Sequence, residues 1–316
     1  MSGSSVTVEG RTLQLSNLEK VLYPRAGFTK AHVIDYYSRI APVLLPHLKN
    51  RPLTLKRYPT GVEGAFFYEK RCPAHRPDWL KTAPVWSDRA EGPIDFCLGN
   101  DVPTLVWLAN LADLELHTSL ALARSIGRPT MMVFDLDPGE PAGLLECAEV
   151  GLQLAELFEQ LELQTVVKTS GSKGMQVYVP LNTPVTYEVT KRFSRAIAEA
   201  LEQRFPHQVV SKMKKSLRPG KVLVDWSQND EHKTTVNVYS LRARENPTVS
   251  TPVSWAEVRR AAKAKDPSML TFEAGAVLER VEALGDLFAP ALKLTQRLPQ
   301  VEPLGAAPRA RRARRK

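Results

Sequence analysis

The run MMVFDLDPGE, residues 131–140, constrains the fold more than any other stretch of this chain. Residues 131–134 are apolar and Pro138 and Gly139 are turn formers, so the run predicts a buried strand that ends at the glycine. Side chains alternate between the two faces of a strand, which places Asp135 and Asp137 on one face, about 7 Å apart. Two carboxylates this close repel each other unless a cation lies between them. The run therefore indicates a divalent-metal site; the alternative is a solvent-facing pair of carboxylates at a strand end.

The composition is that of a globular protein, with 316 residues of which 43% are hydrophobic and 24% charged. No stretch approaches the roughly 18 apolar residues of a membrane span, and the start MSGSSVTVEG is not a secretory signal. Three widely spaced cysteines, Cys72, Cys97 and Cys147, indicate a reducing compartment. We therefore expect a cytoplasmic, nucleoid-associated protein. Cys72 and His75 have a spacing that two zinc ligands can use, but no second pair lies near them, so we do not expect structural zinc.

The net charge of +9 comes mostly from one end of the chain. Six positive charges lie in the last eight residues, RARRARRK, which leaves 9 − 6 = +3 for the rest. We expect residues 299–316 to be a disordered basic tail that adds nonspecific affinity for nucleic acid. Residues 212–221, KMKKSLRPGK, carry five basic residues and no acid. This segment suits phosphates, although a solvated loop is the alternative.

From residue 131 onward the pattern is strand, helix, strand, strand, helix and then further strands. This order predicts an α+β fold, with a mixed sheet of the ferredoxin-like or palm type and helices on one face. We expect one domain over residues 1–290, with an N-terminal part over about 1–120 and a catalytic part over about 121–290. The expected helices are 30–47 (capped by Thr29), 101–114, 141–162, 186–204, 254–264 and 271–287, and the other expected strands are 53–59, 64–70, 164–169, 175–181, 208–211, 221–226 and 235–240.

The segment TSGSKG, residues 169–174, lies between two strands that form a hairpin. Its glycines let backbone amides approach an anion closely, and Lys173 adds a positive charge. It is not a P-loop, because the required spacing is absent and no helix follows. An ordinary glycine turn is the alternative.

Asp225 ends a second apolar strand, in KVLVDWSQND. With Asp135 and Asp137 it would complete a three-carboxylate site for one or two Mg²⁺ or Mn²⁺ ions that also bind nucleotide phosphates. This prediction fails if Asp225 faces the opposite side of the sheet; taken alone, Asp225 could be a strand-end cap. In YSLRAR, Arg242 and Arg244 alternate along a predicted strand and so share a face, which suits a triphosphate. The alternative is solvent-facing charge on an edge strand.

Together these parts predict a nucleotidyl transferase. A metal pair would activate an attacking 3′-hydroxyl and stabilise the departing pyrophosphate, while basic side chains neutralise the developing charge.

The ordered motifs over residues 12–290 make the chain resemble a known family. They are LSNLEKVLYP, RPLTLKRYP, AFFYEK, LELH, VFDLDPGE, TSGSKG, KSLRPGKVLVDWSQN, KTT and YSLR. The set resembles the polymerase domain of bacterial ligase D, in the archaeo-eukaryotic primase superfamily, which serves non-homologous end joining. The resemblance implies a primase-type palm packed against an N-terminal α/β subdomain. It also implies nucleotide addition to 3′ ends at gaps and double-strand breaks, with NTPs preferred over dNTPs and two Mn²⁺ or Mg²⁺ ions.

The resemblance also implies roles for single residues. Asp135, Asp137 and Asp225 match the metal-binding aspartates. Matches to nucleotide-binding or catalytic-pocket positions are Lys56, His117, Ser170, Lys173, Gln176, Arg218, Gln228 and Arg242. Lys20 and Lys30 match lysines that hold the 5′-phosphate of the downstream strand, and Phe66 and Phe67 match an aromatic pair that stacks on the template. From the residues alone, Phe66 and Phe67 would be core, the two lysines surface, and His117 a core histidine just after a helix.

One position departs from the family pattern. Family members commonly have histidine where this chain has Gln176, and glutamine can donate a hydrogen bond but cannot carry a charge. Two alternatives to a polymerase stay open, the first of them because of Gln176. One is a non-catalytic module that bridges DNA ends, and the other is a manganese-dependent glycosyltransferase, which also uses an Asp-x-Asp strand end. We expect a stand-alone polymerase whose partners are DNA with a 5′-phosphate, NTPs or dNTPs, a Ku-type protein and a separate ligase, with no membrane.

Overall fold

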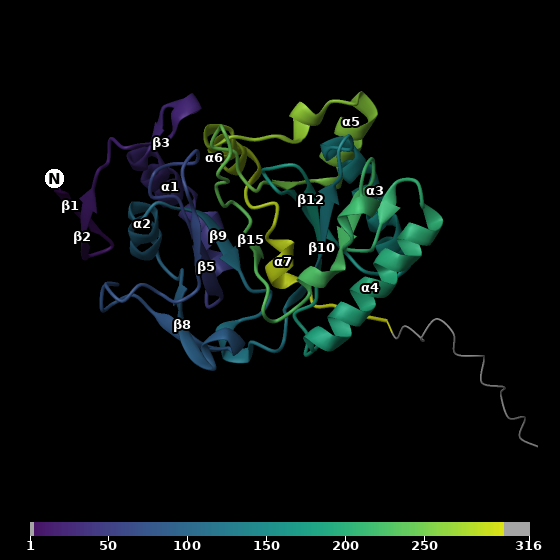
Figure 1. Ribbon diagram of the computed structural model, residues 1–316, viewed down its shortest axis with the longest axis horizontal. Helices are drawn as coiled ribbons and strands as arrows, with labels where there is room; N and C mark the ends of the chain where they lie inside the picture. Colours follow the sequence, from purple (N-terminus) through teal and green to yellow (C-terminus); the bar gives the residue numbers. More distant parts are fainter. Residues whose placement is uncertain (1–2, 300–316) are drawn as a thin grey trace, which may run out of the picture.

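The computed structural model describes residues 3–299, and Figure 1 shows them as two halves side by side. Apart from its first residue, the predicted tail at 299–316 lies outside the described residues. Each half is built on a six-stranded sheet. Within residues 3–299, none of the helices combines the length and the apolar character that crossing a bilayer requires.

The N-terminal half contains a sheet of order β15-β9-β5-β8-β7, with β6 also paired to β5. Its strands are β5 (Pro52–Arg57), β6 (Phe67–Glu69), β7 (Thr82–Ser87), β8 (Gly92–Leu98), β9 (Asp113–Thr118) and β15 (Thr235–Val236). Two small hairpins precede it, β1 (Gly3–Val8) with β2 (Arg11–Ser16) and β3 (Val21–Tyr23) with β4 (Phe28–Thr29). Helices α1 (Lys30–Leu48) and α2 (Val102–Asn110) pack against each other. Thr29 caps α1 as predicted, because its hydroxyl accepts the backbone N–H of His32.

The second half is the palm, a sheet of order β13-β14-β10-β12-β11-β16. Its strands are β10 (Met131–Pro138), β11 (Val166–Thr169), β12 (Met175–Pro180), β13 (Val209–Val210), β14 (Val222–Asp225) and β16 (Pro252–Val253). The predicted hairpin around SGSKG is present as the antiparallel pair β11 and β12. The palm helices are α3 (Leu144–Gln160), α4 (Tyr187–Arg204) and α5 (Trp255–Ala264), followed by α6 (Ala274–Leu284) and α7 (Pro290–Lys293).

Alternation along β10 decides which face of the palm is covered. Met132, Phe134 and Leu136 join a core with the buried residues of α3 and α4, so these helices cover that face. Asp135 and Asp137 point away from it, toward the N-terminal half. The predicted α+β class, with helices on one face of a palm-type sheet, is confirmed.

The chain crosses between the halves after β14. Thr235 and Val236 form β15 and pair with β9 in the N-terminal sheet, after which the chain returns to the palm as β16 and pairs with β11. A strand that lies between two palm strands in the sequence, β15, thus completes the N-terminal sheet. This double crossing fixes the segment 226–253 against both halves.

Three local predictions need correction. Arg242 and Arg244 do not lie on a strand, since the segment makes only an isolated bridge between Leu241 and Val249. His117 lies within β9 rather than just after a helix, because α2 ends at Asn110.

The third correction concerns the cysteines. Cys72 and Cys97 form a disulfide, and Cys147 is free and buried. This pairing removes the cysteine count as an argument for a reducing compartment, and it ties up the Cys72 sulfur that a zinc site would need.

Gly171 generates a stability prediction, because its backbone has a φ of +66° and a Cβ there would lie 2.5 Å from the Val249 carbonyl. We expect Gly171→Ala to lower the free energy of unfolding by more than about 1 kcal/mol in urea denaturation. The control is Gly275→Ala on α6, where nothing lies within 4 Å and alanine favours a helix by up to about 1 kcal/mol. A Gly171→Ala protein as stable as wild type would contradict the close packing of this turn.

Candidate active site

The three predicted metal-binding aspartates lie on one face of the palm. Asp135 on β10 stands directly opposite Asp225 on β14, so these side chains share a face. Asp137 follows two residues after Asp135 on the same strand and faces the same way. On the other side of β10, Asp135 stands opposite Gln176, which in turn stands opposite Lys168. One row across four strands therefore holds two acids, an amide and a buried lysine.

The carboxylates concentrate negative charge at the mouth of the sheet face, where Asp225 is buried, Asp135 is half-buried and Asp137 is exposed. Burial, together with Asp137 and Asp225, raises the pKa of Asp135 to about 7, and burial and Asp225 raise the pKa of Asp137. Asp225 accepts hydrogen bonds from the Ser227 N–H at 2.8 Å and from the Gln228 amide at 3.0 Å. Among residues 3–299, no group of three or more Asp, Glu, His or Cys side chains has an arrangement that could hold a metal ion. The donor set is nevertheless all oxygen, which suits Mg²⁺ or Mn²⁺.

Gln176, the residue that departs from the family pattern, is held between Asp135 and Tyr178. Its amide nitrogen donates to Asp135 Oδ1 at 3.0 Å, and the Tyr178 hydroxyl donates to its amide oxygen at 3.0 Å. An ionised carboxylate can only accept, so in that state the nitrogen faces Asp135. Gln176 therefore directs a donor at an aspartate without bringing a charge into the site.

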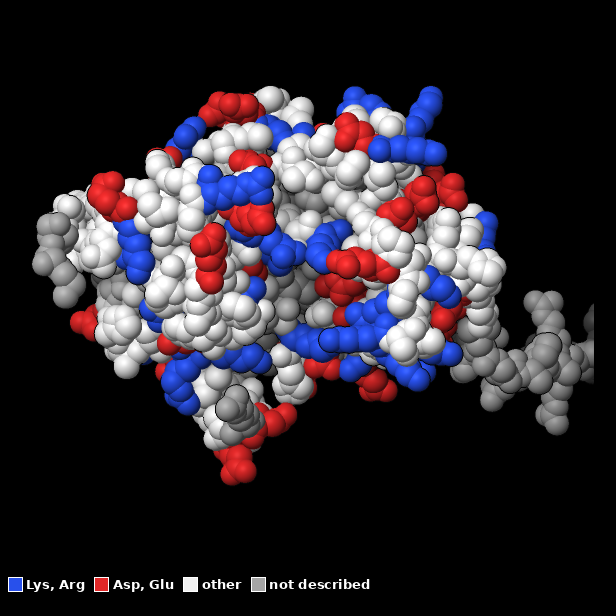
Figure 2. Space-filling view, turned by 45° about the horizontal axis from the view of Figure 1, so that its top comes forward, with Lys and Arg blue, Asp and Glu red and all other residues white. Residues whose placement is uncertain are grey.

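A cleft of about 500 Å³ opens in front of Asp135 and Asp137. Figure 2 shows Lys and Arg side chains on both sides of a hollow between the two halves. The cleft is lined by Tyr68, His117, Asp135, Asp137, Ser170, Ser172, Lys173, Gly174, Gln176, Gln228, Thr234, Thr235, Val236, Arg242 and Arg244. Six of the eight residues expected at the nucleotide pocket, all except Lys56 and Arg218, thus lie at one place.

The SGSKG turn is braced by the two arginines. The Ser170 hydroxyl accepts the N–H groups of Ser172 and Gly174, each at 3.2 Å. Arg242 donates to the Ser170 carbonyl, and Arg244 donates to the Ser172 hydroxyl. Both arginines therefore reach the cleft although they are not on a strand.

Lys173 in this turn forms an exposed ion pair with Glu140, with 2.8 Å between Nζ and Oε1. Exposed pairs of this kind contribute little to stability. The lysine can therefore exchange its partner for a phosphate at small cost.

Glu115, which the sequence analysis missed, holds the cationic side of the cleft. Its carboxylate lies 3.2 Å from Lys56 Nζ, 3.0 Å from His117 Nε2 and 3.3 Å from Arg242 Nε. Burial acts to raise the pKa of Glu115, but the His117 hydrogen bond and the charges of Arg242 and Lys56 hold it well below its usual range. Lys56 does not line the cleft, but it is paired with Glu115, which also contacts the cleft residues His117 and Arg242. The only sequence signal was its place in LELH, two residues before His117.

Arg218 and the basic segment around it form the turn that leads into β14. Lys212, Lys214 and Lys215 are exposed there, and Arg218 donates to the Met213 carbonyl at 2.7 Å. Arg218 also lowers the pKa of Asp137 against the effect of burial. A Cβ on Gly139 would lie 2.2 Å from the Arg218 carbonyl. The glycine that ends the Asp-Leu-Asp strand is therefore what lets this turn approach.

Lys20 and Lys30 lie together at the start of α1, away from the cleft. The Lys30 N–H donates to the Lys20 carbonyl at 2.9 Å, and Lys30 Nζ donates to the Ser16 carbonyl at 2.8 Å. Lys20 is exposed, but Lys30 is buried, so the prediction of two surface lysines is wrong for Lys30. Burial and the neighbouring Lys20 lower the pKa of Lys30. Among residues 3–299 neither ammonium lies within 4 Å of a carboxylate, and Lys30 Nζ is hydrogen-bonded to a carbonyl instead.

Phe66 and Phe67 are both exposed, at 50% and 43%, so the prediction that they are core residues is wrong. They meet different cations, because Lys56 Nζ lies 4.6 Å from the Phe66 ring and Arg57 lies 5.1 Å from the Phe67 ring. Tyr68, which the sequence analysis did not select, is 58% exposed and lines the cleft. The signal was the unbroken aromatic run FFY.

The raised pKa of Asp135 generates a prediction for the metal-free protein. The folded state holds this proton up to about pH 7, against an ordinary pKa of 3.8. Its stabilising contribution is therefore complete below about pH 4 and is lost as the pH rises through 7. We expect Asp135→Asn to raise the free energy of unfolding in EDTA by more than about 1 kcal/mol at pH 8 and by less at pH 4. Exposed Asp35→Asn is the control, and an equal effect at both pH values would contradict the shift.

Comparison with known proteins agrees with this geometry. A model of the LigD primase-polymerase domain matches residues 29–288. The multifunctional non-homologous end joining protein LigD of Mycolicibacterium smegmatis is 40% identical over 280 residues, which is 88% of this chain and 36% of that protein. The bifunctional LigD of Bacillus subtilis is 32% identical over 295 residues, which is 93% of this chain and 46% of the relative. This chain thus spans less than half the length of these relatives.

A solved structure gives the same result. The polymerase domain of Mycobacterium tuberculosis ligase D, in complex with DNA, is 38% identical, with a TM-score of 0.82 over 89% of this chain and 98% of that chain. The chain therefore belongs to the LigD primase-polymerase domain family, a family of nucleotidyltransferases.

Proposed function

We propose that this protein adds nucleotides to DNA 3′ ends at gaps and double-strand breaks, as a template-directed primase-polymerase of non-homologous end joining that prefers NTPs. The observation that carries the proposal is the placement of Asp135, Asp137 and Asp225 on one face, beside a cleft with arginines on its wall. The similarity to a polymerase domain solved with DNA supports the same activity. A glycosyltransferase would not need the third aspartate or the SGSKG turn.

The residues of the cleft have two roles: some neutralise charge on the nucleotide, and others hold these side chains in position. Arg242, Arg244 and Lys173 neutralise a nucleotide triphosphate and the pyrophosphate that leaves. Glu115 keeps Lys56, His117 and Arg242 in place, and Gln176 keeps Asp135 oriented. Two Mn²⁺ or Mg²⁺ ions held by Asp135, Asp137 and Asp225 would supply activation of the 3′-hydroxyl and stabilisation of the leaving group.

The decisive test is extension of a primer on a gapped duplex with labelled NTPs or dNTPs, in Mn²⁺ or Mg²⁺. We expect Asp137→Ala to reduce the rate by at least about 100-fold, because metal-assisted charge stabilisation supplies several kcal/mol. Exposed Asp35→Ala should match wild type. If Asp137→Ala extends primers normally, catalysis is not the function, and retained DNA binding would then favour a module that bridges DNA ends.

The Lys20 and Lys30 pair generates a separate test of the substrate. We expect removal of the 5′-phosphate to weaken binding of the gapped duplex by wild type about tenfold, since a charge-assisted contact is lost. In Lys20→Ala the two duplexes should bind alike, whereas exposed Lys49→Ala should keep the wild-type difference. Equal affinity of wild type for both duplexes would remove the phosphate site from the proposal.

Partners and location follow from the same proposal. A Ku-type end-binding protein would bring the protein to breaks, and a DNA ligase would seal the product, which places the work at the nucleoid in the cytoplasm. The names of the relatives, which are non-homologous end joining proteins, support this setting.

A further inference from the structure

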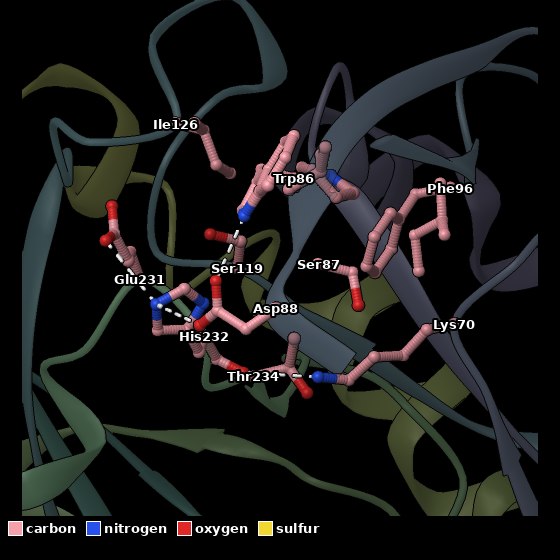
Figure 3. Close-up of a pocket in the computed structure, with 13 residues that line it drawn as sticks. Lys70, Trp86, Ser87, Asp88, Phe96, Ser119, Ile126, Glu231, His232 and Thr234 are labelled. Carbon is pink, nitrogen blue, oxygen red and sulfur yellow. Dashed lines mark hydrogen bonds and ion pairs between the residues drawn. The ribbon is translucent and has the colours of Figure 1, made fainter. Parts of the chain in front are cut away.

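A second pocket, of about 180 Å³, lies beside the active-site cleft. It is formed between the β7–β8 hairpin and the segment 231–234, and Figure 3 shows its side chains around a common space. Its lining residues are Pro52, Lys70, Val85, Trp86, Ser87, Asp88, Ile94, Phe96, Ser119, Ile126, Glu231, His232 and Thr234. None of the predicted site residues lies in it.

The walls of this pocket are apolar and partly aromatic. Phe96 and Ile94 are buried, but Trp86 is 59% exposed, the largest exposed fraction among the bulky hydrophobic residues described. The indole N–H donates to Asp88 Oδ1 at 3.0 Å, which orients the ring at the pocket (Figure 3). An exposed ring held in place in this way offers a stacking surface to a flat ligand.

The rim of the pocket is polar and carries two acids, Asp88 and Glu231, beside a histidine and a lysine. His232 Nε2 lies 3.8 Å from Asp88 and 3.5 Å from Glu231, while Lys70 Nζ donates to the His232 carbonyl at 3.3 Å. Two carboxylates disfavour a phosphate at that side and favour a group that donates N–H bonds. The single lysine on the rim suits one phosphate. The volume is below the roughly 300 Å³ at which pockets for drug-sized ligands begin, so one heterocycle is the scale of ligand that fits.

The pocket is adjacent to the cleft, because Thr234 lines both. A second connection runs along the segment at β6, where Tyr68 lines the cleft and Lys70 lines the pocket. Residues two apart in an extended chain face the same side. A strand of nucleic acid that passes Tyr68 is therefore led to Lys70.

We propose that this pocket binds one unpaired nucleobase of the template strand, beyond the templating position. The base stacks on Trp86, its amino group donates to Asp88 or Glu231, and Lys70 contacts the adjoining phosphate. This assignment rests on the proposed function, because it presumes a template in the cleft. It adds a position at which the template is held outside the site of chemistry.

The test uses primer–template duplexes whose 5′ overhang carries 2-aminopurine at successive positions, with the wild-type protein, Trp86→Leu and Trp86→Phe. Wild type should quench 2-aminopurine at one position beyond the templating base. Trp86→Leu should lose that quenching and bind the overhang on the order of tenfold more weakly, and Trp86→Phe should keep most of both. Leu284→Ala, an exposed apolar residue on α6, is the control. Templates without an unpaired base beyond the templating position should bind Trp86→Leu and wild type alike.

Equal quenching and affinity for wild type and Trp86→Leu at every position would overturn the proposal. A Trp86-dependent fluorescence change with AMP alone, without one for the overhang, would also overturn it, because the pocket would then take a free nucleotide. If the wild-type protein extends no primer but shows Trp86-dependent quenching of an overhang base, the base-binding pocket is supported and the polymerase activity is not. Failure of one proposal is therefore distinguishable from failure of the other.

Discussion

The register of β10 between β14 and β12 is the constraint on which the site depends. It brings Asp225 and Gln176 opposite Asp135 on the face that α3 and α4 leave open. A slip of one residue would turn every side chain of β10 to the other face, and Met132, Phe134 and Leu136 would then meet the cleft while the aspartates met the core. The hydrophobic core of the palm and the placement of the acids are thus specified by the same pairing.

The charges around this row come from both halves of the molecule and from the segment that crosses between them. The palm supplies three closely spaced carboxylates that repel one another, and the N-terminal half supplies Glu115, which pairs with Lys56, His117 and Arg242. Glu115 is itself buried and would be costly there without those partners. Lys168, fully buried at the end of the row, donates to Ser250 at 2.6 Å. Glu115 takes Lys56 and His117 from its own half and Arg242 from the segment that crosses between the halves, and Lys168 takes its partner Ser250 from that same segment.

The features that the sequence predicts correctly are those determined within one short segment. The period of two placed Asp135 and Asp137 together, and the glycine turn with its flanking strands was found from local residues. It failed where distant segments decide: Arg242 and Arg244 are positioned by contacts with the SGSKG turn, not by a strand. The pairing of Cys72 with Cys97 and the burial of Lys30 likewise depend on tertiary packing. Asp225 on β14 is predicted from the order of the motifs. The register between two strands that are distant in the sequence cannot be deduced from either strand alone.

The double crossing of residues 226–253 has a mechanical consequence. Because β15 is hydrogen-bonded to β9 and β16 to β11, one continuous segment is anchored in both sheets. Rotation of one half away from the other must be absorbed by residues 237–251, which connect the two strand pairs, or it breaks one of the pairs. The width of the cleft is therefore coupled to the pairing of both sheets through one short connection of the chain.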